Sequence, residues 1–233
     1  MFNVEGNTAV LEIGANRGLG LELARQYAAD GWRVIATARS PDTPALRELA
    51  AANPRVTTHA LDVTDFAAVD RLAAELSGTS VDVLLNVAGV MGSKRFGAID
   101  YAEWSRVLTV NVLAPMKIAE AFVEHVASSG QKKIVTLTSV MGSIGDNTSG
   151  GYYAYRSSKA AANAVMKSLA VDLSARGIIA VPIHPGWVRT DMGGPNATVD
   201  VVDSVAGMRK VIASLTPADT GRFLQFQGKE LPW

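Results

Sequence analysis

The chain has 233 residues, with 22 lysines and arginines against 22 aspartates and glutamates, and no cysteine. The balanced charge gives no strong field that would recruit nucleic acid or an anionic membrane, and the lack of cysteine excludes disulfides and thiolate metal sites. Residues 1–8 hold no basic segment before an apolar stretch, and no apolar run approaches the ~20 residues of a membrane span. We therefore expect a cytoplasmic protein with no nucleic-acid or membrane partner.

Apolar, β-branched runs alternate with helical patterns along the whole chain. Strands are expected, in chain order, at residues 8–13, 32–38, 55–61, 81–86, 132–138, 178–183 and, on a weaker pattern, 222–226. Helices are expected at residues 19–29, 43–52, 66–77, 101–127, 152–175 and 201–215. The linkers are short and no shift in composition divides the chain. The pattern predicts one doubly wound α/β domain over residues 1–233, with helices on both faces of a parallel sheet.

Residues of chemical interest follow the carboxyl ends of the predicted strands, where such sheets bind their ligands. From the first strand to the sixth, they are residues 14–20, Arg39, residues 62–63, residues 86–89, Ser139 and residues 185–190. Because the strand ends of a parallel sheet meet at one edge, we expect these residues to form one site.

Glycines at positions 14, 18 and 20 follow the first strand and open a helix. They allow the backbone to turn tightly and to approach a pyrophosphate, whose charge is favoured at a helix N-terminus. The spacing is GxxxGxG rather than the commoner GxGxxG, and glycine-rich turns are frequent between strand and helix. The position between a strand and a helix is the context that a dinucleotide site requires.

The second predicted strand ends at Arg39, without the acidic residue that would hold a ribose 2′-hydroxyl, and Arg17 lies within the glycine loop. Two guanidinium groups suit a 2′-phosphate, so the sequence favours NADPH over NADH. The alternative is that both arginines are solvated surface residues. Asp62 could accept a hydrogen bond from the adenine amino group, or cap the helix that starts near Asp65.

Tyr155 and Lys159 are four residues apart and share one face of a predicted helix. An ammonium beside a phenol favours the phenolate and lowers its pKa from about 10, which gives a proton donor and acceptor near neutral pH. Beside a dinucleotide site, such a pair indicates hydride transfer to or from a carbonyl. An ordinary exposed helical pair is the alternative, but Tyr152 and Tyr153 have no lysine four residues on.

These residues, in this order, resemble the short-chain dehydrogenase/reductase family over essentially the whole chain. The runs at residues 14–20 and 151–159 are similar to the C-factor, sniffer and carbonyl-reductase-like branch. The resemblance implies a Rossmann fold with strand order 3-2-1-4-5-6-7. It also implies a catalytic tetrad of Asn111, Ser139, Tyr155 and Lys159. The remaining cofactor residues would be Asn16, Leu19, Val63, Asn86, Ala88, Gly89, Pro185, Gly186, Val188 and Thr190.

The resemblance also implies roles for the tetrad. Tyr155 is the acid or base at the carbonyl oxygen, Ser139 holds that oxygen, and Lys159 bonds the nicotinamide ribose. Asn111 holds a water that links Lys159 to solvent, and Thr190 holds the nicotinamide carboxamide. Simpler readings are that Ser139 ends a strand and that Asn111 makes a structural hydrogen bond. Nearby hydroxyls that rival Ser139 are those of Thr138 and Ser143.

The sequence departs from the family pattern at three positions: Glu12 lies in a central strand, Ile13 replaces a threonine, and Val87 replaces an asparagine. An unpaired buried carboxylate is costly, so Glu12 should be protonated or paired. The histidines have no metal-ligand spacing, so no metal is expected; they are His59, His125 and His184.

The expected function is NADPH-dependent interconversion of carbonyls and alcohols, with a small or apolar aldehyde, ketone or diketone as substrate. Loop residues over the predicted site could line an apolar pocket or only pack the loops; they are Met91, Met141, Trp187 and Met192. One alternative is a nucleotide-binding signalling or regulatory protein with incidental catalysis. Another is a sugar-nucleotide epimerase or dehydratase, which the glycine spacing disfavours. Family members are often homodimers or tetramers, and this branch includes monomers.

Overall fold

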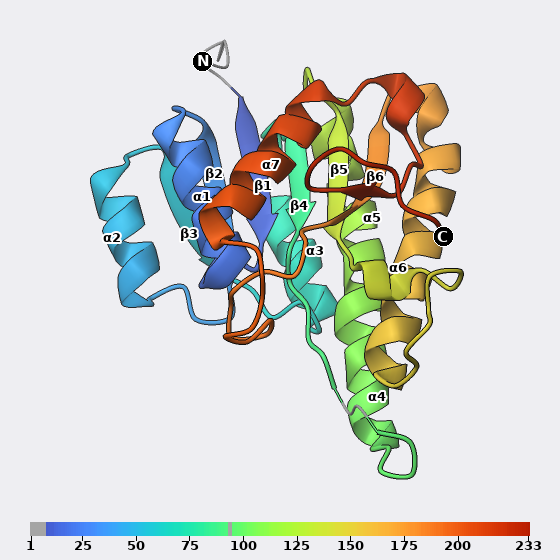
Figure 1. Ribbon diagram of the computed structural model, residues 1–233. Coiled ribbons are helices and arrows are strands. Elements are labelled where there is room, and N and C mark those ends of the chain that lie inside the picture. The colour runs from blue at the N-terminus through green and yellow to red at the C-terminus, as the bar shows by residue number, and fades with distance from the viewer. Residues whose placement is uncertain (1–7, 93–94) are drawn as a thin grey trace.

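The computed structural model describes residues 8–92 and 95–233. The sequence predicts no signal peptide at the N-terminus, and residues 1–7 of that segment lie outside the described part. A central sheet lies between two layers of helices, and α4 extends beyond the carboxyl ends of the strands, at the bottom of the view (Figure 1). No helix in the described ranges is long and apolar enough to cross a membrane.

The described residues form one seven-stranded sheet in which every neighbouring pair is parallel. Its order is β3-β2-β1-β4-β5-β6-β7, which confirms the predicted order. The strands are β1 Ala9–Ile13, β2 Arg33–Ala38, β3 Val56–Ala60, β4 Val83–Asn86, β5 Lys133–Leu137, β6 Ile179–His184 and β7 Leu224–Gln225. The order reverses between β1 and β4, where doubly wound sheets open a ligand crevice.

Helices cover both faces of the sheet, as predicted. One face packs on α1 Gly18–Ala29, α2 Pro44–Ala52 and α7 Val201–Ser214. The other packs on α3 Phe66–Glu75, α5 Ala114–Ala127 and α6 Tyr153–Asp172. Alternate residues of β1 supply the two cores: Val10 joins the first, and Leu11 and Ile13 join the second. Each face therefore buries a continuous apolar layer, which fixes the register of the strands.

The helix expected over residues 101–127 is interrupted. It consists of α4 Tyr101–Leu108, a π-helical turn η1 Thr109–Leu113, and then α5. Pro115, in the first turn of α5, has no amide hydrogen to donate to the carbonyl of Asn111, four residues before it in the π-turn. Such turns are frequent at functional sites, and Asn111 lies within this one.

Short 3-10 turns complete the connections. They are η2 Val140–Gly142, η3 Ser174–Arg176 and η4 Pro217–Asp219. The last strand is shorter than expected, because only Leu224–Gln225 pairs with β6.

Glu12 is fully buried in β1, and neither of its carboxyl oxygens has a hydrogen-bond partner within the described chain. Burial raises the pKa of Glu12 well above its ordinary value, so the side chain is held as the neutral acid. The sequence predicted a protonated or a paired carboxyl, and the structure favours the protonated form.

Candidate active site

A cleft of about 660 Å³ opens along the carboxyl ends of the strands. Loops from β1, β2, β3, β4 and β6 meet there with the start of α6, as the positions after the strand ends predicted. The predicted residues that line it are Gly14, Asn16, Arg17, Gly18, Leu19, Gly20, Arg39, Asp62, Val63, Ala88, Gly89, Tyr155, Lys159, Pro185 and Thr190.

The glycine loop is shaped so that a phosphate can approach its backbone. Gly14 has φ +105°, and a Cβ there would lie 2.9 Å from the amide nitrogen of Ala88. A Cβ on Gly20 would lie 2.1 Å from the carbonyl oxygen of Gly14. Arg17, the N-cap of α1, makes no side-chain capping bond, so first-turn amide groups of the helix are available to an anion. The loop therefore fits the pyrophosphate of a dinucleotide.

Both predicted phosphate-binding arginines line the cleft. Arg17 forms an ion pair with Asp191, which lies on the loop after β6 at the opposite side of the cleft. The side chains of this pair are 67% and 78% exposed, so the pair is worth at most about 1 kcal/mol and does not prevent Arg17 from binding a phosphate.

Asp62 lines the cleft and does not cap α3. Its Oδ1 accepts from the amide of Thr64 at 2.9 Å and from the Thr64 hydroxyl at 2.7 Å. These bonds, with a smaller effect of Arg39, lower the pKa of Asp62. The helix is capped by Asp65, which accepts from the Ala68 amide, so the capping role suggested for Asp62 is wrong.

Tyr155 and Lys159 line the cleft, whereas Ser139 lies outside its lining; each of the three is less than 10% exposed. The hydroxyl of Ser139 is close enough to the Tyr155 phenol to lower the pKa of that phenol, and it accepts from the amide of Met141 at 3.1 Å. Lys159 Nζ lies 5.6 Å from the centre of the Tyr155 ring and donates to the carbonyl oxygen of Leu137 at 2.8 Å. A phenol, a hydroxyl and an amine thus lie in the same buried region.

The expected lowering of the Tyr155 pKa is wrong for this structure. Burial raises the pKa of the Tyr155 phenol, and the hydroxyl of Ser139 opposes the rise only in part. The Lys159 amine points to the Leu137 carbonyl rather than to the phenol oxygen, and burial lowers the pKa of Lys159 to about 8. Tyr155 is therefore a protonated phenol, which is the form that donates a proton.

Asn111 holds the loop after β4 against α6. Its Oδ1 accepts from the Val90 amide at 2.9 Å, and its Nδ2 donates to the Val90 carbonyl at 2.8 Å and to the Ser158 hydroxyl at 2.9 Å. A Cβ on Gly89 would lie 3.5 Å from Asn111 Oδ1 and 3.6 Å from Lys159 Nζ. The structural hydrogen bond weighed for Asn111 is therefore present, and it places Asn111 beside the lysine.

The sequence model of the family described as short chain dehydrogenase matches residues 8–200, more than half of the chain. The chain belongs to the short chain dehydrogenase family. The resemblance that the motifs suggested is thus confirmed, and the seven-stranded sheet of this short chain dehydrogenase agrees with it.

Relatives of this short chain dehydrogenase fall in the expected branch. C-signal of Myxococcus xanthus is 47% identical over 154 residues, which cover 66% of this chain and 93% of the relative. The structure of carbonyl reductase Sniffer of D. melanogaster has TM-score 0.90 and 34% identity, and the match covers 97% of this chain and 99% of that one. The NADPH-bound carbonyl reductase from chicken fatty liver has TM-score 0.91 and 33% identity, with 99% and 100% covered.

The alternative hydroxyls and phenols near the site are engaged elsewhere. Thr138 donates to Asn163 Oδ1 at 2.7 Å, and Ser143 donates to the main-chain oxygen of Trp233 at 3.1 Å. The Tyr153 ring is 37% exposed and lies 6.4 Å from that of Phe96. Of the candidates weighed from the sequence, Ser139 and Tyr155 are the ones that lie together.

Three predicted cofactor residues lie outside the cleft lining. Asn86 donates to the Thr136 hydroxyl at 3.3 Å and ties β4 to β5. Gly186 has φ +88° and lies against the ring of Phe226, and Val188 is buried opposite Val199. These three residues belong to the strand end and the loop that lie next to lining residues.

Other lining residues of this short chain dehydrogenase were not predicted: Ala38, Leu61, Thr64, Val87, Val90, Arg106, Val110, Leu137, Thr138, Arg189 and Asp191. Most are neighbours in sequence of predicted residues. Arg106 and Val110 are one helical turn apart, but neither is three or four residues from Asn111, so helical periodicity from Asn111 does not single them out. Met192, suggested for an apolar pocket, does line the cleft.

Proposed function

We propose that the protein is an NADPH-dependent reductase of small or apolar aldehydes, ketones or diketones, with Tyr155 as the proton donor. The observation that carries the proposal is the burial of Tyr155 with Ser139 and Lys159 at the cleft that the glycine loop borders, with Lys159 Nζ 5.6 Å from the centre of the Tyr155 ring. In reverse, the same groups would oxidise an alcohol.

NADP is favoured as the cofactor by the charges of the cleft. Arg17 in the glycine loop and Arg39 after the second strand both line the cleft, and the residue that follows the second strand is not a carboxylate. The expected preference agrees with the chicken carbonyl reductase, whose structure contains NADPH.

The residues divide the chemistry between them. When bound, the nicotinamide supplies the hydride that adds to the carbonyl carbon. Tyr155 donates the phenolic proton to the carbonyl oxygen, and Ser139 hydrogen-bonds the same oxygen and fixes its position. The buried ammonium of Lys159 stabilises the phenolate that Tyr155 leaves, and it holds the nicotinamide ribose.

Asn111 supplies the route by which Tyr155 regains its proton. Both hydrogens of its side-chain amide already bond Val90 and Ser158, so a water would be held by the main-chain oxygen of this π-turn. Lys159 then passes a proton from that water to the Tyr155 phenolate.

The apolar part of the lining favours an uncharged substrate. Val90 and Leu137, which bond Asn111 and Lys159, line the cleft beside the catalytic groups, and Met192 lines it as well. Polar side chains that line the same cleft include those of Tyr155, Lys159 and Thr138. A carbonyl with small or apolar substituents suits this surface.

The test is NADPH oxidation against a panel of aldehydes, ketones and diketones. Turnover should fall by about 10²–10⁴-fold in Tyr155→Phe, which removes the proton donor and keeps the ring. Tyr153→Phe is the matched control, because that exposed phenol lies two residues away and outside the cleft. Equal activity of the Tyr155→Phe variant and the wild type would contradict the assignment.

A nucleotide-binding signalling protein is the second candidate. The unpartnered Glu12 in β1 and the resemblance to a relative named C-signal favour it. Tight NADPH binding without turnover of any carbonyl in the panel would support this candidate over the first.

A further inference from the structure

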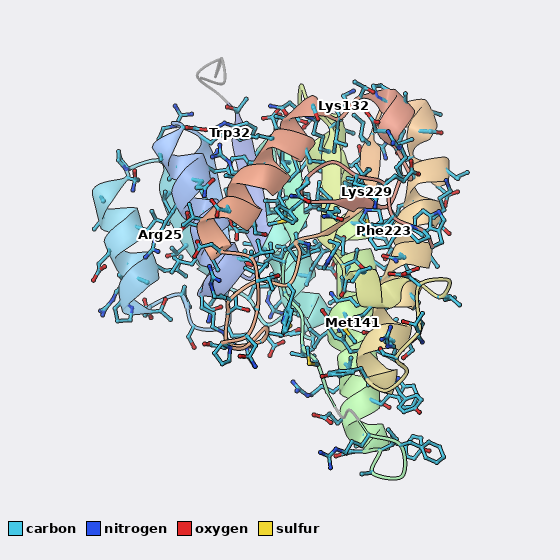
Figure 2. The ribbon with its side chains drawn as sticks, in the orientation of Figure 1. Arg25, Trp32, Lys132, Met141, Phe223 and Lys229 are labelled. Carbon is cyan, nitrogen blue, oxygen red and sulfur yellow. The ribbon has the colours of Figure 1, made fainter. Side chains whose placement is uncertain are left out.

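The last residues of the chain fold back on the sheet and end near the catalytic serine. We call residues 229–233 the tail. Gln225 donates its amide to the Lys229 carbonyl at 2.8 Å, and Leu231 donates to the Phe223 carbonyl at 2.8 Å. The ring of Trp233 lies 5.6 Å from that of Phe223, which is fully buried. In Figure 2 Phe223 and Lys229 lie in this region, and Met141 lies on the same side of the molecule.

The main-chain oxygen of Trp233 accepts three hydrogen bonds from one short segment. The donors are the hydroxyl of Ser143 and the amides of Ile144 and Gly145, each at 3.1 Å. The Ser143 oxygen also accepts from the amide of Asp146 at 3.1 Å, and Ser143 is only 2% exposed. Three hydrogen bonds to one oxygen thus fix the position of the start of this loop.

The segment that Trp233 holds is continuous with the turn that carries Ser139. Ser139 is the N-cap of η2, its carbonyl accepts from Gly142 at 2.8 Å, and Ser143 closes the turn with a bond to Val140. On the other side, a Cβ on Gly142 would lie 2.8 Å from the carbonyl carbon of Lys159. The turn η2 is thus held between α6 and the tail.

We propose that the tail is a strap that positions Ser139, with Trp233 as a positioning residue for the catalytic hydroxyl. The proposal rests on the proposed function, because it assigns Ser139 to the substrate carbonyl. Trp233 acts through Ser143 and η2, and the Phe223 contact holds its ring so that the main-chain oxygen reaches the loop.

The need for such a strap follows from the loop that it anchors. Residues 144–150 are exposed, and Gly150 and Gly151 have positive φ before α6 begins. The loop has few apolar contacts of its own, so its local opening costs little free energy. Without the tail, this motion would reach η2, and a small displacement of a positioned group is enough to slow a reaction.

Trp233→Ala is the variant that tests the strap. We expect kcat to fall about tenfold, with the dissociation constant of NADPH changed by less than about twofold, because the tail does not line the cleft. Amide exchange of Ile144, Gly145 and Met141 should become faster, since Met141 bonds the Ser139 oxygen. Trp233→Phe keeps an aromatic ring against Phe223 and should restore kcat.

Lys229→Ala is the matched control, because its exposed side chain lies in the same tail. It should leave kcat and amide exchange unchanged. Wild-type kcat in Trp233→Ala, or an equal loss of NADPH affinity and kcat, would overturn the proposal. If the wild type turns over no carbonyl, the proposed function fails, and the exchange rate of the Met141 amide then tests the strap alone. An unchanged exchange rate of that amide in Trp233→Ala would reject the strap.

Discussion

Burial sets the charge of three side chains that lie on or beside the first strand and the sixth helix. It raises the pKa of Tyr155 and of Glu12 and lowers that of Lys159 to about 8. For Tyr155 the result is a phenol ready to donate, and for Lys159 an amine whose charge is sensitive to its surroundings near neutral pH. For Glu12 the result is a neutral acid packed against Gly20, where a Cβ would lie 3.0 Å from Oε1.

The buried Glu12 should make stability fall as pH rises. Above its ordinary pKa of 4.5 the unfolded chain releases a proton that the folded protein keeps. The free energy of unfolding then decreases by up to about 1.4 kcal/mol per pH unit until the folded-state pKa is reached. Urea unfolding between about pH 5 and pH 8 should show this slope in the wild type and lose most of it in Glu12→Gln.

Glu48→Gln serves as the control for that slope, because Glu48 is exposed on α2. It should leave the pH dependence of stability unchanged. A Glu12→Gln variant with the same slope as the wild type would show that Glu12 is ionised or paired in solution.

At the scale of elements, the glycine loop and the loop after β6 face each other across the cleft. Arg17 of the first pairs with Asp191 of the second, and a Cβ on Gly18 would lie 3.4 Å from the Thr190 methyl. A bound dinucleotide must therefore enter between two loops that already touch, and Arg17 has further N–H groups to offer its phosphate.

Arg17→Ala and Arg39→Ala should each weaken NADPH far more than NADH. Loss of one charged hydrogen bond to the 2′-phosphate raises the NADPH dissociation constant by about tenfold or more, while that of NADH changes by less than about twofold. Fluorescence titration with both cofactors measures this difference. Asp191→Asn, which breaks the ion pair and leaves both arginines, should keep the preference for NADPH. Equal losses for both cofactors would contradict the phosphate assignment.

Sequence patterns predict the helices and strands, but not their local irregularities. The apolar run at residues 132–138 predicted β5 to within a residue at each end, because a buried parallel strand must be apolar throughout. The π-turn around Asn111 could not be predicted, since it depends on Pro115 together with the bonds that Asn111 makes to Val90. These bonds join residues far apart in the chain.

At the scale of the whole molecule, topology brings the site together. The predicted strand order places the ends of β1, β4 and β5 side by side, and Tyr155 and Lys159 reach them from α6. The convergence of the site residues could be predicted, because the carboxyl ends of parallel strands lie at one edge of the sheet. The docking of Trp233 on Ser143 could not, because the tail has no periodic pattern and its main-chain oxygen carries no sequence signal.

The most direct measurement of the central claim is the transfer of the cofactor's hydrogen to a product. The enzyme would be incubated with NADPH deuterated at one face of the nicotinamide C4 and with a carbonyl compound from the panel that it reduces. The alcohol product would then be analysed by mass spectrometry and NMR. We expect one deuterium on the former carbonyl carbon from one of the two labelled forms, and none within the same time with Tyr155→Phe. Alcohol that carries no deuterium from either form, or equal transfer in the Tyr155→Phe variant, would contradict the central claim.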